Sequence, residues 1–166
     1  MVHYMSKTLD RFDIALLNLL QSNNVATAEM LAREVPLSPS AITRRLRRLR
    51  EEGMIAADIA ILSPRLVENR LRAVIHIQAH EHAEEKGIAS LRAKLAEAPE
   101  VQLLLNISGP FDLLLLVVTR NMAAFNDFAD SFLAADPTVR RYETSFVKKE
   151  VKNRPAVRLD ERDLAR

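Results

Sequence analysis

The stretch of residues 111–118 constrains the fold of this chain more than any other segment. Side chains point alternately to the two faces of a β-strand, and here both sets are apolar. One set is Leu113, Leu115 and Val117, and the other is Leu114, Leu116 and Val118. A strand that is apolar on both sides is buried on both sides. Any fold that contains this strand must therefore bury both of its faces.

The segments around this strand alternate between strand-like and helix-like periods from Leu71 to about Val151. Strands are predicted from Leu71, over 101–108, over 111–119 and from Val139. Helices are predicted where apolar residues recur at helical spacing, namely Ile88, Leu91 and Leu95, and then Phe125, Phe128 and Phe132. The order β-α-β-β-α-β predicts a ferredoxin-like unit of the α+β class, with two helices on one face of the sheet. The other face then needs a partner, most simply a second copy, so we expect a homodimer.

The first fifty residues carry the signals of three short helices. Asp10, Thr27 and Ser38 are good N-caps, and Pro39 suits the first position of the third helix. Gly53 suits the end of that helix. Helices of roughly 12, 8 and 14 residues with short joints predict a tri-helical, winged helix-turn-helix.

The third of these helices concentrates positive charge in five arginines, Arg44, Arg45, Arg47, Arg48 and Arg50. At 100° per residue, Ile42, Leu46 and Leu49 share the side that should face the other two helices. Since a major groove accepts a helix and arginine pairs with guanine edges, this helix is a candidate reader of DNA. The competing interpretation is a solvated basic face.

The helical angles divide the polar residues of this helix by expected role. The side opposite the core is predicted to face the bases, and it holds Ser40, Thr43, Arg44 and Arg47. Ser38 and Arg48 are better placed for phosphates. Arg45 lies where an ion pair with an acid is as plausible as a DNA contact, and Arg50 lies near the core boundary.

Composition narrows the function classes. The net charge of +2 makes the arginines a local excess, and the lack of cysteine excludes disulfides and thiolate metal sites. With no apolar run of membrane-spanning length, we expect a soluble cytoplasmic protein. Three glycines leave little room for a phosphate-cradling loop, and no nucleophile has a base beside it, so we expect no enzyme. His80 and His82 hint at a metal site, but we interpret them as an exposed loop and predict no metal.

Several segments, taken in order, resemble the Lrp/AsnC (leucine-responsive/asparagine regulator) family of transcription regulators. In the first half these are Leu9-Asp10, Ala28-Glu29-Met30-Leu31-Ala32, Leu37-Ser38-Pro39-Ser40, Arg45-Leu46-Arg47-Arg48-Leu49 and Gly53-Met54-Ile55. In the second half they are Ser108-Gly109-Pro110-Phe111-Asp112 and the closing strand Lys148 to Lys152. The resemblance implies a DNA-binding regulator that dimerises through its ferredoxin-like domain, often assembles into tetramers or octamers, and responds to a small effector, usually an amino acid.

The resemblance also implies an effector site at the turn between the second and third strands. The matching positions are Ser108, Gly109, Phe111 and Asp112. Gly109 permits close backbone approach, and Asp112 could accept an α-ammonium group. A tight β-turn whose aspartate satisfies its own loop is an equal alternative.

Two prolines depart from the family pattern. Pro36 stands where the family usually has glycine, so the turn must differ in geometry or the helix before it must end earlier. Pro110 stiffens the effector turn and leaves effector identity open. The expected layout is a DNA-binding domain over 1–55, a linker over 56–70, an effector domain over 71–152 and a charged tail over 153–166. That tail is compatible with a short helix and with a frayed end.

The sequence leaves two alternatives to an effector-tuned regulator. One is an enzyme, since some relatives with this architecture resemble tetrapyrrole decarboxylases, although an enzyme has little reason to keep a groove-facing basic helix. The other is a constitutive, ligand-free oligomer that bundles DNA.

Overall fold

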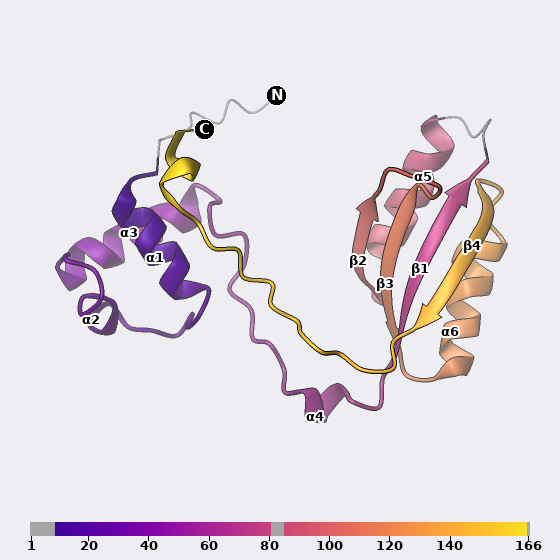
Figure 1. Cartoon of the computed structure of the whole chain (residues 1–166), viewed down its shortest axis with the longest axis horizontal. Coiled ribbons are helices and arrows are strands. Elements are labelled where there is room, and N and C mark those ends of the chain that lie inside the picture. Colours follow the sequence, from indigo (N-terminus) through magenta and orange to yellow (C-terminus); the bar gives the residue numbers. More distant parts are fainter. Residues whose placement is uncertain (1–8, 81–84, 166) are drawn as a thin grey trace. The chain divides into compact units, whose positions relative to one another are not determined.

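The computed structural model describes residues 9–80 and 85–165, which divide into two compact units (Figure 1). The first unit contains the chain up to Ile61 together with the segment from Lys152 onward. The second unit runs from Leu62 to Val151.

Three helices build the first unit: α1 (Arg11–Leu20), α2 (Ala28–Leu31) and α3 (Pro39–Glu51). The structure confirms all three predicted N-caps, because the side chains of Asp10, Thr27 and Ser38 each accept a backbone N–H of the helix that follows. A buried core holds the helices together, formed by Leu16, Leu20, Leu31, Val35 and Ile42.

The second helix is shorter than expected, with 4 residues. Its chain continues as tighter turns, in which Arg33 N–H donates to the Met30 carbonyl. The Leu37 N–H then donates to the Val35 carbonyl at 2.7 Å across Pro36. Proline's fixed φ suits the centre of such a three-residue turn, so Pro36 is accommodated without the positive φ that a glycine would allow.

Gly53 ends α3 as predicted, with φ of 71°. Its N–H donates to the Arg50 carbonyl and the Met54 N–H donates to the Leu49 carbonyl, which is the Schellman arrangement. Beyond it the described residues form no strand before β1, so the wing expected there is not formed. A short helix, α4 (Pro64–Val67), lies in this stretch.

The second unit is a four-stranded antiparallel sheet with two helices. Its elements are β1 (Leu71–Ala79), α5 (Glu85–Glu97), β2 (Val101–Asn106), β3 (Leu113–Thr119), α6 (Met122–Ala129), continued by a π-helical turn over Asp130–Ala134, and β4 (Val139–Phe146). The strand order β2-β3-β1-β4 confirms the ferredoxin-like prediction. Figure 1 shows α5 and α6 on the same side of the sheet.

The two faces of the sheet differ in cover. On the helix side, paired residues such as Ile75 and Leu115 are fully buried. On the open side, Leu114, Leu116 and Val118 of β3 are only half-buried, and Leu103 and Leu105 of β2 are each 42% exposed. The expected contrast between a covered and an uncovered apolar face is therefore present in the described part of the unit.

Three strands are shorter than predicted. β2 stops at Asn106 and does not reach Ser108. β4 stops at Phe146, and the next residue, Val147, donates to the Arg72 carbonyl close to where β1 begins. β3 starts at Leu113, since Phe111 and Asp112 belong to the preceding turn.

Candidate nucleic-acid interface

Helix α3 separates a buried side from an exposed one. Ile42 and Leu49 are completely buried. The residues predicted to face DNA bases are all exposed, and they are Ser40, Thr43, Arg44 and Arg47. α3 therefore presents a polar surface with two exposed arginines to whatever approaches it.

The beginning of α3 is held by hydroxyl groups. Ser38 Oγ accepts the Ala41 N–H at 3.3 Å and lies 3.1 Å from Ser40 Oγ. Thr43 Oγ1 donates to the Pro39 carbonyl at 2.9 Å. These local bonds place the three hydroxyls around the exposed first turns of the helix.

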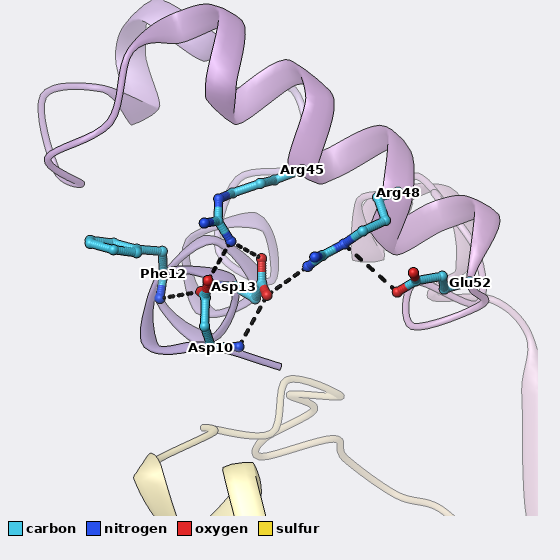
Figure 2. A network of polar contacts seen from close by, with 6 residues as sticks. All are labelled: Asp10, Phe12, Asp13, Arg45, Arg48 and Glu52. Carbon is cyan, nitrogen blue, oxygen red and sulfur yellow. Dashed lines mark hydrogen bonds and ion pairs between the residues drawn. The ribbon is translucent and has the colours of Figure 1, made fainter. Parts of the chain in front are cut away.

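A network of charges joins α3 to the start of α1 (Figure 2). Asp13 is only 1% exposed, and its Oδ1 accepts Arg45 Nη1 at 2.8 Å while its Oδ2 accepts Arg48 Nη2 at 2.6 Å. Arg45 Nη1 also donates to Asp10 Oδ2 at 2.7 Å. Since a buried carboxylate is stable only when paired, these two arginines fix α3 against α1.

The same aspartates cap α1. Asp10 Oδ1 accepts the N–H groups of Phe12 and Asp13, and the Asp10 N–H donates to Asp13 Oδ2. Partial burial would raise the pKa of the Asp10 carboxyl, but the bonds from the Asp13 N–H and from Arg45 hold that pKa below its usual range. Desolvation would lower the pKa of Arg45, but its bonds to Asp10 and Asp13 raise it.

The five arginines therefore differ in their surroundings. For Arg45 the sequence left an ion pair and a DNA contact as alternatives, and the structure shows ion pairs with Asp10 and Asp13. Arg48 is also paired, since Glu52 lies 3.7 Å from its Nε. Arg50 donates to Asp58 at 2.8 Å. Arg47 is 72% exposed and only 3.8 Å from the equally exposed Glu51, and Arg44 has no ion pair within the described residues.

Sequence reasoning did not identify Asp10 and Asp13 as partners of these arginines. Asp10 was recognised only as a cap. Two aspartates three residues apart at a helix start signal a reciprocal cap, but nothing local signals which arginine they meet.

The predicted effector turn has one special backbone position and one engaged carboxylate. Gly109 has φ of 133°, a conformation that side chains rarely allow. Asp112 Oδ2 accepts the Ala79 N–H at 2.8 Å, so the aspartate ties the turn to the end of β1. Ser108 is exposed, and the Phe111 ring lies 5.3 Å from the His76 ring, with the Arg141 guanidinium 5.1 Å from its centroid. His76 and Arg141 are neighbours that the sequence did not indicate.

Other sites receive no support from the described residues. No group of three or more metal-ligating side chains converges among them, and His82 lies outside them. None of the helices in the described ranges has the length and apolar character needed to cross a membrane.

Comparison with known proteins agrees with this arrangement. The model of the AsnC-type helix-turn-helix domain matches residues 9–50, and that of the Lrp/AsnC ligand binding domain matches residues 72–157. The leucine-responsive regulatory protein of Haemophilus influenzae is 33% identical, covering 89% of this chain and 88% of its own length. An uncharacterised HTH-type transcriptional regulator of Sinorhizobium fredii is 33% identical, over 92% and 89% of the two chains.

A solved structure extends the comparison to the whole fold. A transcriptional regulator from Neisseria meningitidis, solved as a complex with L-Met, superposes with a TM-score of 0.80 at 33% identity. The match covers 90% of this chain and 96% of that one. The chain belongs to the Lrp/AsnC family of DNA-binding transcriptional regulators.

Proposed function

We propose that this regulator reads its operator with the exposed side of α3 placed in the major groove. The observation that carries the proposal is the division among the arginines: Arg45 and Arg48 are held by buried Asp13, while Arg44 and Arg47 extend into solvent. Arginines that are not needed for the fold remain available for guanine edges, and Ser40 and Thr43 add hydroxyls that suit several bases.

Ser38 and Arg48 would contact phosphates beside these bases. Ser38 lies at the N-terminus of a 13-residue helix, where the backbone favours an anion. Arg48 uses Nη2 for Asp13, and its Nε is buried beside Glu52, so a phosphate would take Nη1 and leave both pairs intact.

We further propose that two copies bind together through the open faces of their sheets. The residues available for this contact are apolar and incompletely covered in one chain, namely Leu103, Leu105, Leu114, Leu116 and Val118. Burial of such a surface against its own copy gives a twofold dimer. The two α3 helices would then read two half-sites related by the same axis.

Selection of binding sites from random DNA tests this function. We expect the selected sequences to contain an inverted repeat, and we expect the affinity to fall steeply as salt rises because phosphate contacts release counterions. Selection of no common sequence, or of a single unrepeated half-site, would contradict a dimeric operator reader.

The effector is proposed to be an amino acid bound at the turn that contains Ser108, Gly109, Phe111 and Asp112. The Neisseria regulator, solved with L-Met, supports an amino acid as the ligand class. Asp112 uses Oδ2 for the Ala79 N–H, which leaves Oδ1 for an α-ammonium group, and the backbone at Gly109 carries no side chain that would block a carboxylate.

A thermal-shift series with the common amino acids tests the effector. A ligand present at 100 times its Kd stabilises the state that it binds by about 2.7 kcal/mol, which is a shift of several degrees. We expect at least one amino acid, with methionine tried first, to produce this shift. The N-acetyl amide of the same amino acid lacks both charges and should not. If no amino acid shifted the Tm at millimolar concentrations, the proposed effector would be wrong and the regulator would act without an amino acid.

A further inference from the structure

The segment from Lys152 onward carries contacts that the DNA-reading and effector sites do not explain. We propose that this segment is a structural element of the DNA-binding unit, docked along α1, and that the effector unit is therefore an insertion within the DNA-binding unit. The proposal goes beyond the proposed function, because it holds whether or not DNA or an amino acid binds.

Two side-chain amides of α1 pair with the backbone of this segment. Asn18 Nδ2 donates to the Leu159 carbonyl at 3.0 Å, and Asn18 Oδ1 accepts the Leu159 N–H at 2.9 Å. In the same way, Gln21 Nε2 donates to the Val157 carbonyl at 2.8 Å, and Gln21 Oε1 accepts the Val157 N–H at 2.6 Å. A carboxamide offers one acceptor and a donor side by side, so each amide pairs with a residue's backbone much as a neighbouring strand would.

The spacing of these contacts fixes the direction of the segment. Asn18 and Gln21 are three residues apart and share one face of α1. Val157 and Leu159 are two residues apart and point their backbone groups the same way in an extended chain. Because the earlier segment residue meets the later helix residue, the segment runs antiparallel to α1, and it ends in a short 3-10 helix, η2 (Glu161–Ala165), that packs on α1.

The burial of apolar side chains on α1 also indicates that the segment packs against this helix. Leu16 is completely buried in the core with α2 and α3. Ile14 lies two residues earlier, so it points about 200° away from Leu16, to the opposite side of the helix. Even so, Ile14 is 6% exposed and Leu17 is 8% exposed, and neither belongs to the core cluster of the three helices. The segment lies on that side of α1, where Asn18 and Gln21 hold it and where its Leu159 and Leu164 are half-buried, so its position agrees with the burial of Ile14 and Leu17.

This arrangement gives the effector unit two covalent connections. The chain leaves the DNA-binding unit after Ile61 and returns to it at Lys152. The chain that follows α3 therefore leads into β1, and the chain that follows β4 leads to the segment docked on α1.

Hydrogen exchange in the full-length protein tests the docking directly. The N–H groups of Val157 and Leu159 donate to Gln21 and Asn18, so we expect them to exchange about ten- to a hundredfold more slowly than in an unstructured peptide. In the double variant Asn18→Ala/Gln21→Ala this protection should disappear. Asn126→Ala, which removes an exposed amide from α6, should leave it unchanged. Exchange of both groups at peptide rates in the wild-type chain would overturn the proposal.

Truncation after Val151 gives a second measurement. We expect amides of α1 to exchange at least tenfold faster in the truncated chain, while amides of β1 and β3 keep their wild-type rates. Equal rates in α1 with and without the segment would show that the segment contributes nothing to the unit. Neither measurement depends on DNA, so failure of the operator-reading proposal would leave both results interpretable.

Discussion

Replacement of Asp13 by alanine should destabilise the DNA-binding unit by about 2–3 kcal/mol, near the lower end of the cost of breaking a buried ion pair. The carboxylate is 1% exposed and accepts hydrogen bonds from Arg45, from Arg48 and from the Asp10 N–H. Its loss leaves two guanidinium groups without their buried partner. These groups are 24% and 32% exposed, so partial hydration keeps the cost below the maximum. Thermal unfolding should show a decrease in Tm of about 10–20 °C for this unit.

Glu51→Ala is the matched control, since it removes the same charge from the same unit. Glu51 pairs with Arg47 at 3.8 Å, and both side chains are about 70% exposed, so we expect a change within about 0.5 kcal/mol. Asp13→Asn keeps the shape and one acceptor and should fall between the two. If the Asp13→Ala and Glu51→Ala variants had the same Tm, the ion-pair network would not be what holds α3 against α1.

Removal of Arg44 or Arg47 should weaken operator binding without affecting the fold. A bidentate contact with a base is worth about 1–3 kcal/mol, so each alanine variant should bind about 5- to 150-fold more weakly. Because neither side chain is buried, the Tm should stay at the wild-type value. Fluorescence anisotropy with the selected operator, over a range of salt concentrations, measures the affinity and its salt dependence.

Two further variants separate base reading from general charge. Arg44→Lys keeps the charge but loses the planar fork, so it should reduce discrimination between operator and unrelated DNA while the salt dependence remains. Arg120→Ala removes an exposed arginine from the effector unit and should change operator affinity little. Equal losses for Arg120→Ala and Arg44→Ala would reduce the role of α3 to nonspecific attraction.

The boundaries of α3 could be predicted because they depend on local chemistry. Ser38, Pro39 and Gly53 act on the backbone within a few residues, through a side-chain cap, a fixed φ and a positive φ. The strand pattern of the second unit was similarly evident, since Leu113, Leu115 and Val117 alternate with a second apolar set whatever surrounds them. The length of α2 was overestimated, because the chain tightens into narrower turns before Pro36 and helix propensity does not predict where such tightening begins.

The partners of α3 could not be predicted, because they depend on contacts between distant residues. The contacts of Arg45 and Arg48 with Asp13 span 32 and 35 positions. Helical angles placed Arg48 toward phosphate, and its phosphate contact stays a prediction, but the angles gave no sign that α1 would bring a carboxylate to its guanidinium. The contacts of Asn18 and Gln21 with the C-terminal segment span 141 and 136 positions, and no motif marks them.

That last pairing has a consequence for synthesis of the protein. The helix α1 leaves the ribosome before the second unit, and the segment docked on its outer side leaves after that unit. At about 5–20 residues per second, a separation of 141 residues corresponds to roughly 7–30 s. All residues of the second unit emerge before Lys152 follows, so that unit can fold while the first is still incomplete. A nascent chain, or a chain translated from a truncated mRNA, would thus carry a folded sheet and an incompletely folded DNA-binding unit.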